Sequence, residues 1–207
     1  METIKNIYCV GRNYVEHVHE LGNMVPDQPV IFSKPTHALV KANHRTIQLP
    51  NDQGDIHYEA ELVLKVGEDY QPDCSIDDVI SEMTIGLDLT LRDVQNGLKE
   101  KAHPWLLSKG FKNSAVFGRF IPFPGIDECK KMKYFLYINN KKRQTGDISK
   151  MIFPIETLVH FIGKNLGLKK DDIIYTGTPE GVGPLQDGDE ITMYWDEEVL
   201  GESKIQI

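Results

Sequence analysis

The stretch IHYEAELVLKV, residues 56–66, carries the pattern from which the fold can best be argued. Its alternation of apolar and polar residues, ended by Gly67, predicts a β-strand. Because successive side chains of a strand point to opposite faces, Glu59 and Glu61 share one face, about 7 Å apart along the chain, and His57 shares it too. The other face carries the residues suited to a core, which are Tyr58, Ala60, Leu62 and Leu64.

Two glutamates on one strand face have two interpretations. A solvated strand face is the ordinary explanation of an isolated Glu-x-Glu motif. In a buried site the like charges would repel, and leaving them uncompensated would cost several kcal/mol. A divalent cation held between the two carboxylates would remove that cost.

A second segment, IGLDLTLRDVQ at residues 85–95, favours the buried site. Within it Asp88 lies between Leu87 and Leu89, just before a predicted helix. A carboxylate in such apolar surroundings requires a partner. Together with the two glutamates it forms a set suited to a hard, oxygen-seeking ion such as Mg²⁺ or Mn²⁺, with positions left open for a substrate.

The remaining patterns predict more strands than helices, without regular alternation between the two. Further strands are expected over 133–139, running into a hairpin turn at Asn139-Asn140, over 172–176 and over 190–195. Helices are expected over 154–166, followed by Gly167, over 90–101 with a Thr90-x-x-Asp93 capping pattern, and over 13–21 with Asn13 as N-cap. We therefore predict a β-rich α+β domain rather than a doubly wound sheet.

Composition limits the classes of function. The 207 residues, of which 40% are hydrophobic, suffice for one domain with a substantial core. A formal net charge of −8 argues against a nucleic-acid partner, which would require a basic face. No apolar run approaches the roughly 20 residues of a membrane span, and residues 1–7 lack the features of a signal or transit peptide. We expect a cytoplasmic protein in which Cys9, Cys74 and Cys129 are free thiols.

Several motifs, in order along the chain, resemble the fumarylacetoacetate hydrolase family. The segments that carry the resemblance are GRNYVEHVHEL (11–21), FSKP (32–35), IHYEAEL (56–62), GLDLTLRDVQ (86–95), PWLLSKGF (104–111) and YTGTPEGVGPL (175–185). The short single-domain members, acylpyruvate hydrolases and oxaloacetate decarboxylases, are the most similar. The resemblance implies a mixed β-sheet roll or sandwich with a few short helices, in one catalytic domain over residues 1–207, and a homodimer.

The resemblance also implies a role for particular residues. It implies that Glu59, Glu61 and Asp88 bind Mg²⁺ or Mn²⁺, that Lys109 is the active-site lysine, and that Arg92, Gln95 and Thr178 line the substrate site. It further implies that His17 and Glu20 form a catalytic pair on a mobile lid, residues 11–24.

The residues themselves support several of these roles. His17 and Glu20 are three apart, so on a helix they can form a hydrogen bond suited to a general base, although a polar surface helix is the alternative. Lys109 leaves an apolar segment, where it could balance the charge of −1 left by three carboxylates and one divalent ion. The glycine-rich loop at 176–183 could bind a carboxylate or form a plain turn. His19 is expected to be exposed.

The sequence thus predicts a divalent-metal-dependent hydrolase that cleaves a C–C bond in acylpyruvate-type 1,3-diketo acids, releasing pyruvate and a carboxylic acid. The metal would chelate the small keto-acid substrate and stabilise the enolate formed on cleavage, while His17 and Glu20 activate water. Alternatives are an oxaloacetate decarboxylase, a metal-dependent isomerase or hydratase acting on a 2-keto acid, and a non-catalytic metal-binding module.

Overall fold

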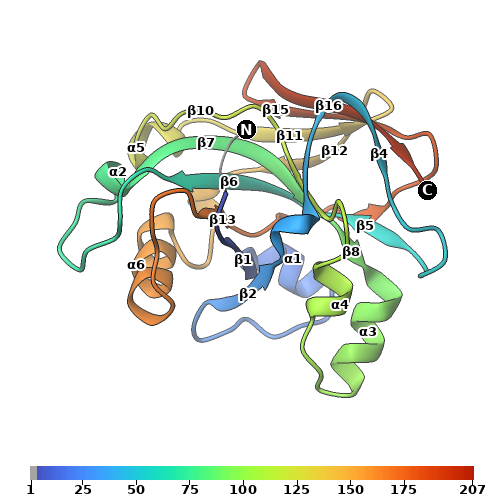
Figure 1. Ribbon diagram of the computed structural model, residues 1–207, viewed down its shortest axis with the longest axis horizontal. Coiled ribbons are helices and arrows are strands. Elements are labelled where there is room, and N and C mark those ends of the chain that lie inside the picture. Colours follow the sequence, from blue (N-terminus) through green and yellow to red (C-terminus); the bar gives the residue numbers. More distant parts are fainter. Residues whose placement is uncertain (1–3) are drawn as a thin grey trace.

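The predicted β-rich α+β architecture is confirmed. In the computed structural model, which describes residues 4–207, two mixed β-sheets pack against each other, and α1, α3, α4 and α6 lie on the opposite side of the larger sheet (Figure 1). A smaller, three-stranded sheet lies at one end. The prediction of one domain over 1–207 includes three residues that lie outside the described residues.

The larger sheet has eight strands in the order β2-β1-β13-β6-β7-β9-β3, with β10 paired to β7. β1 runs parallel to β13 and β3 to β9, and the other pairs are antiparallel. Its strands are β1 (Ile7–Gly11), β2 (Val30–Lys34), β3 (Leu39–Lys41), β6 (Ala60–Val66), β7 (Ile80–Asp88), β9 (Ala115–Phe117), β10 (Ile121–Pro122) and β13 (Ile173–Tyr175).

The second sheet has five strands in the order β12-β11-β15-β16-β4. They are β4 (Asn43–Gln48), β11 (Tyr134–Ile138), β12 (Lys141–Gly146), β15 (Glu190–Trp195) and β16 (Glu198–Gln206). The predicted hairpin at Asn139 and Asn140 is confirmed, because both residues have positive φ, 52° and 59°, as a tight type I′ turn requires.

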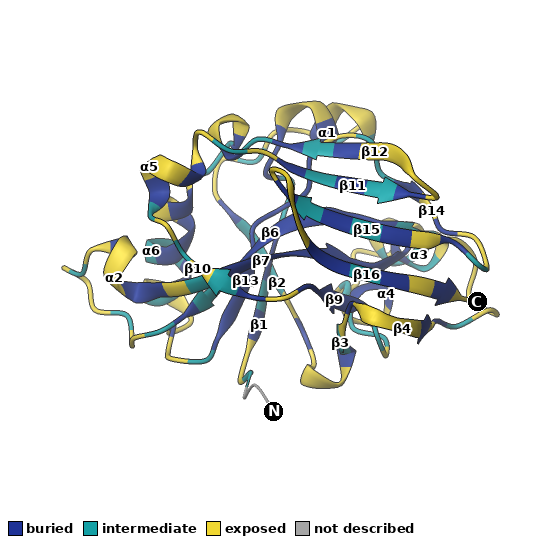
Figure 2. Ribbon diagram, turned by 90° about the horizontal axis from the view of Figure 1, so that it is seen from above, coloured by how far each residue is buried: buried dark blue, intermediate teal, exposed yellow. Residues whose placement is uncertain are grey.

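The hydrophobic core lies between these two sheets, and Figure 2 shows the five-stranded sheet lying over β6 and β7. The predicted core face of the 56–66 stretch is confirmed, since Tyr58, Ala60, Leu62 and Leu64 are all buried. From the facing sheet, Leu136 and Met193 are fully buried in the same cluster. Burying a side chain of the size of leucine stabilises the fold by about 1.5–3 kcal/mol, so this layer fixes the position of β6 and β7.

The prediction of one continuous strand over 56–66 is wrong at one residue. The chain breaks at Glu59 into β5 (Ile56–Tyr58) and β6, because β5 pairs with β8 (Thr90–Leu91) and β14 (Gly183–Pro184) in the three-stranded sheet. At the break, the Ala60 N–H donates to the Gln144 side chain instead of a neighbouring strand, with N and Oε1 2.9 Å apart.

The helices are short, as predicted. They are α1 (Val15–Glu20), α2 (Ile76–Val79), α3 (Arg92–Glu100), α4 (Leu106–Lys109), α5 (Ile126–Cys129) and α6 (Ile155–Asn165), with 3₁₀ turns η1 (Thr36–Ala38) and η2 (Ile148–Lys150). α6 and the positive φ of Gly167, 81°, confirm the prediction for 154–166.

Within residues 4–207, no helix is both long and apolar enough to cross a membrane. The three cysteines are free, as predicted.

Two predicted helix starts are wrong. Asn13 does not cap α1, because its side chain bonds the carbonyls of Thr176 and Phe153. The helix predicted from Thr90 begins at Arg92, because Thr90 belongs to β8. Asn13 through its side chain, and Thr90 through strand pairing, connect the chain to other elements, which a local capping pattern does not reveal.

Gly146 provides a test of how the Tyr134 ring packs against the neighbouring strand of the five-stranded sheet. It lies opposite Tyr134, and a Cβ at this position would overlap the buried Tyr134 ring. We predict that Gly146→Ala lowers the free energy of unfolding by about 1–3 kcal/mol. Gly97→Ala is the matched control, because Gly97 lies in α3 with no atom near the added methyl group, and it should be neutral or stabilise by up to about 1 kcal/mol. Equal unfolding midpoints in urea for the two variants would contradict this packing.

Candidate active site

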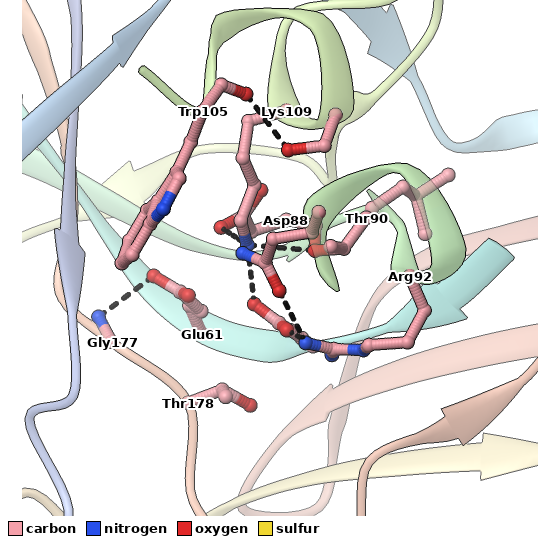
Figure 3. A network of polar contacts seen from close by, with 12 residues as sticks. Glu61, Asp88, Thr90, Arg92, Trp105, Lys109, Gly177 and Thr178 are labelled. Atoms are coloured by element: carbon pink, nitrogen blue, oxygen red, sulfur yellow. Dashed lines mark hydrogen bonds and ion pairs between the residues drawn. The ribbon is translucent and has the colours of Figure 1, made fainter. Parts of the chain in front are cut away.

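The register between β6 and β7 brings three carboxylates together. Glu61 lies opposite Gly86, and the Asp88 N–H donates to the carbonyl of Glu59 over 2.8 Å, so Asp88 lies across from Glu59. Oxygen atoms of Glu59, Glu61 and Asp88 lie within 4.8 Å of one another, and all three residues are at most 5% exposed. We refer to these three residues as the carboxylate triad (Figure 3). Their burial excludes the alternative of a solvated strand face.

Lys109, at the end of α4, reaches into the triad. Its ammonium group donates to Glu59 Oε2 over 2.7 Å, to Asp88 Oδ2 over 2.6 Å and to the Thr90 hydroxyl over 2.7 Å (Figure 3). Burial alone would lower the pKa of Lys109, but the adjacent carboxylates of Asp88 and Glu59 raise it above its usual value. The three protons of the ammonium group therefore all have acceptors within the site.

Arg92, the first residue of α3, holds the other oxygen of Glu59. One guanidinium nitrogen lies 2.6 Å from Glu59 Oε1, and the other donates to Gln95 Oε1 over 2.7 Å. Burial would raise the pKa of Glu59, but Lys109, Arg92 and His17 together lower it well below its usual range. Glu59 is therefore held as an anion.

Lys34 is a site residue that the sequence reasoning missed. Its ammonium nitrogen lies 2.7 Å from Asp88 Oδ1 and is fully buried. It donates to the backbone carbonyls of Leu89, Lys109 and Ser114. The available signal was a lysine in the FSKP motif, placed at the end of an otherwise apolar strand.

Counting these cations changes the electrostatic prediction. With all groups in their ionised forms the carboxylate triad would contribute −3, and Lys34, Arg92 and Lys109 contribute +3, so the group carries no net negative charge even before a metal ion is counted. The expectation that Lys109 alone offsets a metal-bound triad was therefore incomplete. With a divalent ion added, this group would carry an excess charge of +2, which suits an anionic substrate.

Glu61 has no cationic partner within the described chain. One of its oxygens accepts a hydrogen bond from the Gly177 N–H over 2.7 Å (Figure 3). Burial, and then the charges of Asp88 and Glu59, raise the pKa of Glu61 well above its usual value. The glycine-rich loop at 176–183 was expected either to bind a carboxylate or to form a plain turn. It binds a carboxylate, and that carboxylate is the side chain of Glu61. Gly177, whose N–H makes this bond, has a φ of 100°, a backbone conformation that favours glycine.

Thr178, in the same loop, is buried, and its hydroxyl accepts a hydrogen bond from the Gln144 side chain over 2.9 Å. Gln144 also accepts from the Ala60 N–H between the two glutamates. Gln144 therefore links β6 to the glycine-rich loop. No sequence pattern pointed to it, since it lies in a polar run of the β12 edge strand.

The residues present fit a divalent cation. Asp88 Oδ1 is buried and accepts no hydrogen bond, although Lys34 lies beside it, because the Lys34 protons are directed to backbone carbonyls. A buried carboxylate oxygen with one ion pair and no hydrogen bond has lone pairs left for a cation. The three converging carboxylates offer only oxygen ligands, the donor set that Mg²⁺ and Mn²⁺ prefer.

His17 and Glu20 form the pair expected from their spacing. His17 Nδ1 lies 3.1 Å from Glu20 Oε2, and the Gly181 N–H donates to Glu20 Oε1 over 3.1 Å. His17 is 5% exposed, whereas His19 on the same helix is exposed, as predicted. Tyr14 and Val18 are fully buried, so α1 is packed down over the site. The mobility of residues 11–24 stays a prediction.

One cavity joins all of the predicted site residues except Glu20. It is lined by the triad, His17, Arg92, Gln95, Lys109 and Thr178, and also by Arg12, Phe32, Lys99 and Trp105. Glu20 lies behind His17, next to a neighbouring pocket that His57 lines. His57 lines this neighbouring pocket and not the cavity of the triad, contrary to the expectation that it shares the face of Glu59 and Glu61.

Comparison with known proteins defines the class to which this fold and site belong. Residues 6–206 match the family described as fumarylacetoacetate (FAA) hydrolase C-terminal. The chain therefore belongs to the fumarylacetoacetate hydrolase family, as the motifs indicated.

Individual relatives and one solved structure are similar to this chain over most of its length. The chain is 38% identical over 198 residues to the oxaloacetate tautomerase YcgM of Escherichia coli, covering 93% of this chain and 89% of that protein. It is 36% identical over 193 residues to the mitochondrial oxaloacetate decarboxylase of Dictyostelium discoideum, with coverage of 92% and 88%. The structure of fumarylpyruvate hydrolase from Pseudomonas aeruginosa in complex with Mn²⁺ and pyruvate is similar with a TM-score of 0.91 and 28% identity, over 99% of this chain and 90% of that one.

Metal binding to the triad can be measured without turnover. Because a ligand that binds only the folded state stabilises it, by about 2.7 kcal/mol at 100 times its Kd, Mn²⁺ should raise the melting temperature of the wild type. Glu61→Gln and Asp88→Asn should each lose most of that increase, because each removes an anionic ligand. Glu100→Gln, at the exposed end of α3, makes the same change of charge and should retain it. A full Mn²⁺-dependent increase in both triad variants would contradict the proposed ligands.

Proposed function

We propose that this protein is a divalent-metal-dependent enzyme that interconverts the enol and keto forms of a 2-keto dicarboxylic acid, with oxaloacetate as the leading substrate. The observation that carries the proposal is the buried group of three carboxylates and three cations, which would carry a net positive charge with a divalent ion bound. The names of the relatives support oxaloacetate as the substrate.

A divalent ion held by Glu59, Glu61 and Asp88 would supply Lewis acidity toward a keto oxygen, where negative charge develops during enolisation. Lys109 keeps Glu59 and Asp88 in their anionic form and places a further positive charge beside the cavity. Gln95 and Thr178 offer neutral polar groups that orient the bound acid.

His17 is the group suited to move a proton. Its Nδ1 is engaged by Glu20, which fixes the orientation of the ring and leaves Nε2 as the nitrogen that can serve the cavity. A base hydrogen-bonded to a carboxylate in this way can take a proton from C3 of a keto acid and deliver it to the enolate oxygen, or move it in the reverse direction. Lys109 is less suited to this role, because its ammonium group already donates to Glu59, Asp88 and Thr90.

Hydrolysis of an acylpyruvate is the second candidate, and the 3.1 Å contact between His17 and Glu20 is the observation that favours it. The same pair could activate water for attack on a distal carbonyl, and a structurally similar relative is a fumarylpyruvate hydrolase. Decarboxylation of oxaloacetate requires the electron sink but no activated water.

One set of assays distinguishes these reactions. With Mg²⁺ or Mn²⁺, we expect the wild type to accelerate the ketonisation of enol-oxaloacetate, followed by its ultraviolet absorbance, and chelator to abolish the acceleration. Carbon dioxide release from oxaloacetate and pyruvate release from acetylpyruvate are measured in parallel. Cleavage of acetylpyruvate without any effect on oxaloacetate tautomers would overturn the proposal in favour of the hydrolase.

His17 separates reactions that require proton transfer from one that does not. We predict that His17→Ala lowers kcat for ketonisation, and for any acetylpyruvate hydrolysis, by roughly 10²- to 10⁴-fold, the loss typical of a general acid–base group. Any decarboxylation should fall much less. His19→Ala is the control, because His19 lies on the same helix but is exposed, and it should retain full activity. Equal losses in all reactions for His17→Ala would mean that His17 serves binding or closure rather than proton transfer.

A further inference from the structure

The active-site cavity contains more positive charge than the carboxylate triad accounts for. Arg12 and Lys99 line it in addition to Arg92 and Lys109. Within residues 4–207, neither Arg12 nor Lys99 forms an ion pair with an acidic side chain. The nearest polar partner recorded for Lys99 is the Asn23 amide oxygen, at 3.4 Å. Two cations without anionic partners therefore face the space in which a substrate would lie.

The two residues come from different elements that converge on the cavity. Arg92, Gln95 and Lys99 are spaced i, i+3 and i+7 on α3, so all three share one face of the helix. Arg12 follows β1, and its guanidinium carbon lies 5.8 Å from the centre of the Trp105 ring, so the indole supports the charge from one side. Figure 3 shows Trp105 and Arg92 on opposite sides of the triad.

The backbone of Arg12 is also held in an unusual conformation. Its φ is 59°, in the left-handed region that residues other than glycine seldom adopt. The preceding Gly11 packs against Trp105, and the following Asn13 is bonded to Thr176 and Phe153, so both neighbours are fixed. The Arg12 side chain is therefore directed by the fold rather than free on the surface.

Positive charges that lie close together raise the free energy of each other's charged form. Partial burial, and then Arg12 and Arg92, lower the pKa of Lys99. Such a cluster is costly unless an anion binds to it. A pyruvate-like head group at the triad would use one carboxylate of a substrate, whereas a keto diacid carries a second carboxylate for which the triad offers no partner.

We propose that Arg12 and Lys99 form a subsite for the distal carboxylate of the substrate, and that they select 2-keto dicarboxylates over 2-keto acids with a neutral tail. This inference rests on the proposed function for the position of the keto-acid head group. It assigns to this chain a specificity that the triad alone does not provide, because the triad would treat both classes of keto acid alike.

The test compares the binding of two acids that differ at the distal end. 3,3-Difluorooxaloacetate carries the second carboxylate and cannot enolise at C3, and pyruvate lacks the second carboxylate. Their dissociation constants are measured by calorimetry on Mg²⁺-saturated protein for the wild type, Arg12→Gln, Lys99→Gln and Lys99→Arg. Lys101→Gln, an exposed lysine just beyond α3 that does not line the cavity, is the control for net charge.

We expect Arg12→Gln and Lys99→Gln each to weaken difluorooxaloacetate about 10- to 100-fold, as for loss of a charge-assisted hydrogen bond. Pyruvate should change by less than about threefold by the same reasoning, since it makes no distal contact. Lys99→Arg should restore most of the affinity, and Lys101→Gln should behave as the wild type. Unchanged binding of the diacid, or equal losses for both acids, would overturn the subsite.

The outcome is independent of turnover. If the wild type prefers the diacid through Arg12 and Lys99 but does not interconvert oxaloacetate tautomers, the proposed reaction is wrong and the subsite stands. If the wild type accelerates oxaloacetate ketonisation but binds the diacid no more tightly than pyruvate, the proposed function stands and the subsite is wrong.

Discussion

The site depends on the buried contact between the Lys109 ammonium and the carboxylates of Glu59 and Asp88, at 2.7 and 2.6 Å. Taking these charges out of water is costly, and the network is stable only while every member keeps its partner. Lys34 and Arg92 complete the network from two other elements. Removing one charge would leave another buried and unpaired, at a cost of about 3–5 kcal/mol. The fold around the site is therefore built to keep oppositely charged groups in fixed positions before any ligand binds.

This arrangement explains why one site can be related to several reactions. Ketonisation, decarboxylation and C–C hydrolysis of keto acids all develop negative charge on a keto oxygen, and a fixed set of positive charges stabilises it without reorganisation. What differs is the proton or water chemistry beside the keto group and the recognition of the distal end. In this chain we assign those tasks to separate groups, proton transfer to His17 with Glu20 and recognition of the distal end to Arg12 with Lys99.

Much of this could be predicted from sequence because the carboxylate pattern is local. Alternation along 56–66 placed Glu59 and Glu61 on one face, and apolar neighbours marked Asp88 as buried. The break at Glu59 could not be predicted, because it results from β5 joining a different sheet. Lys34 and Gln144 were missed for a similar reason. Lys34 and its partner Asp88 are 54 residues apart in the chain, and Gln144 and its partner Ala60 are 84 residues apart. Only the tertiary fold brings these residues together.

The most direct test of the central claim is a diffraction experiment on crystals grown with Mn²⁺ and oxalate, with data collected at the manganese absorption edge. The account predicts one strong anomalous peak bonded to Glu59, Glu61 and Asp88, with oxalate on its cavity side, and Lys109 still in contact with Glu59 and Asp88. A peak elsewhere in the protein, or none between these three carboxylates at saturating Mn²⁺, would contradict it.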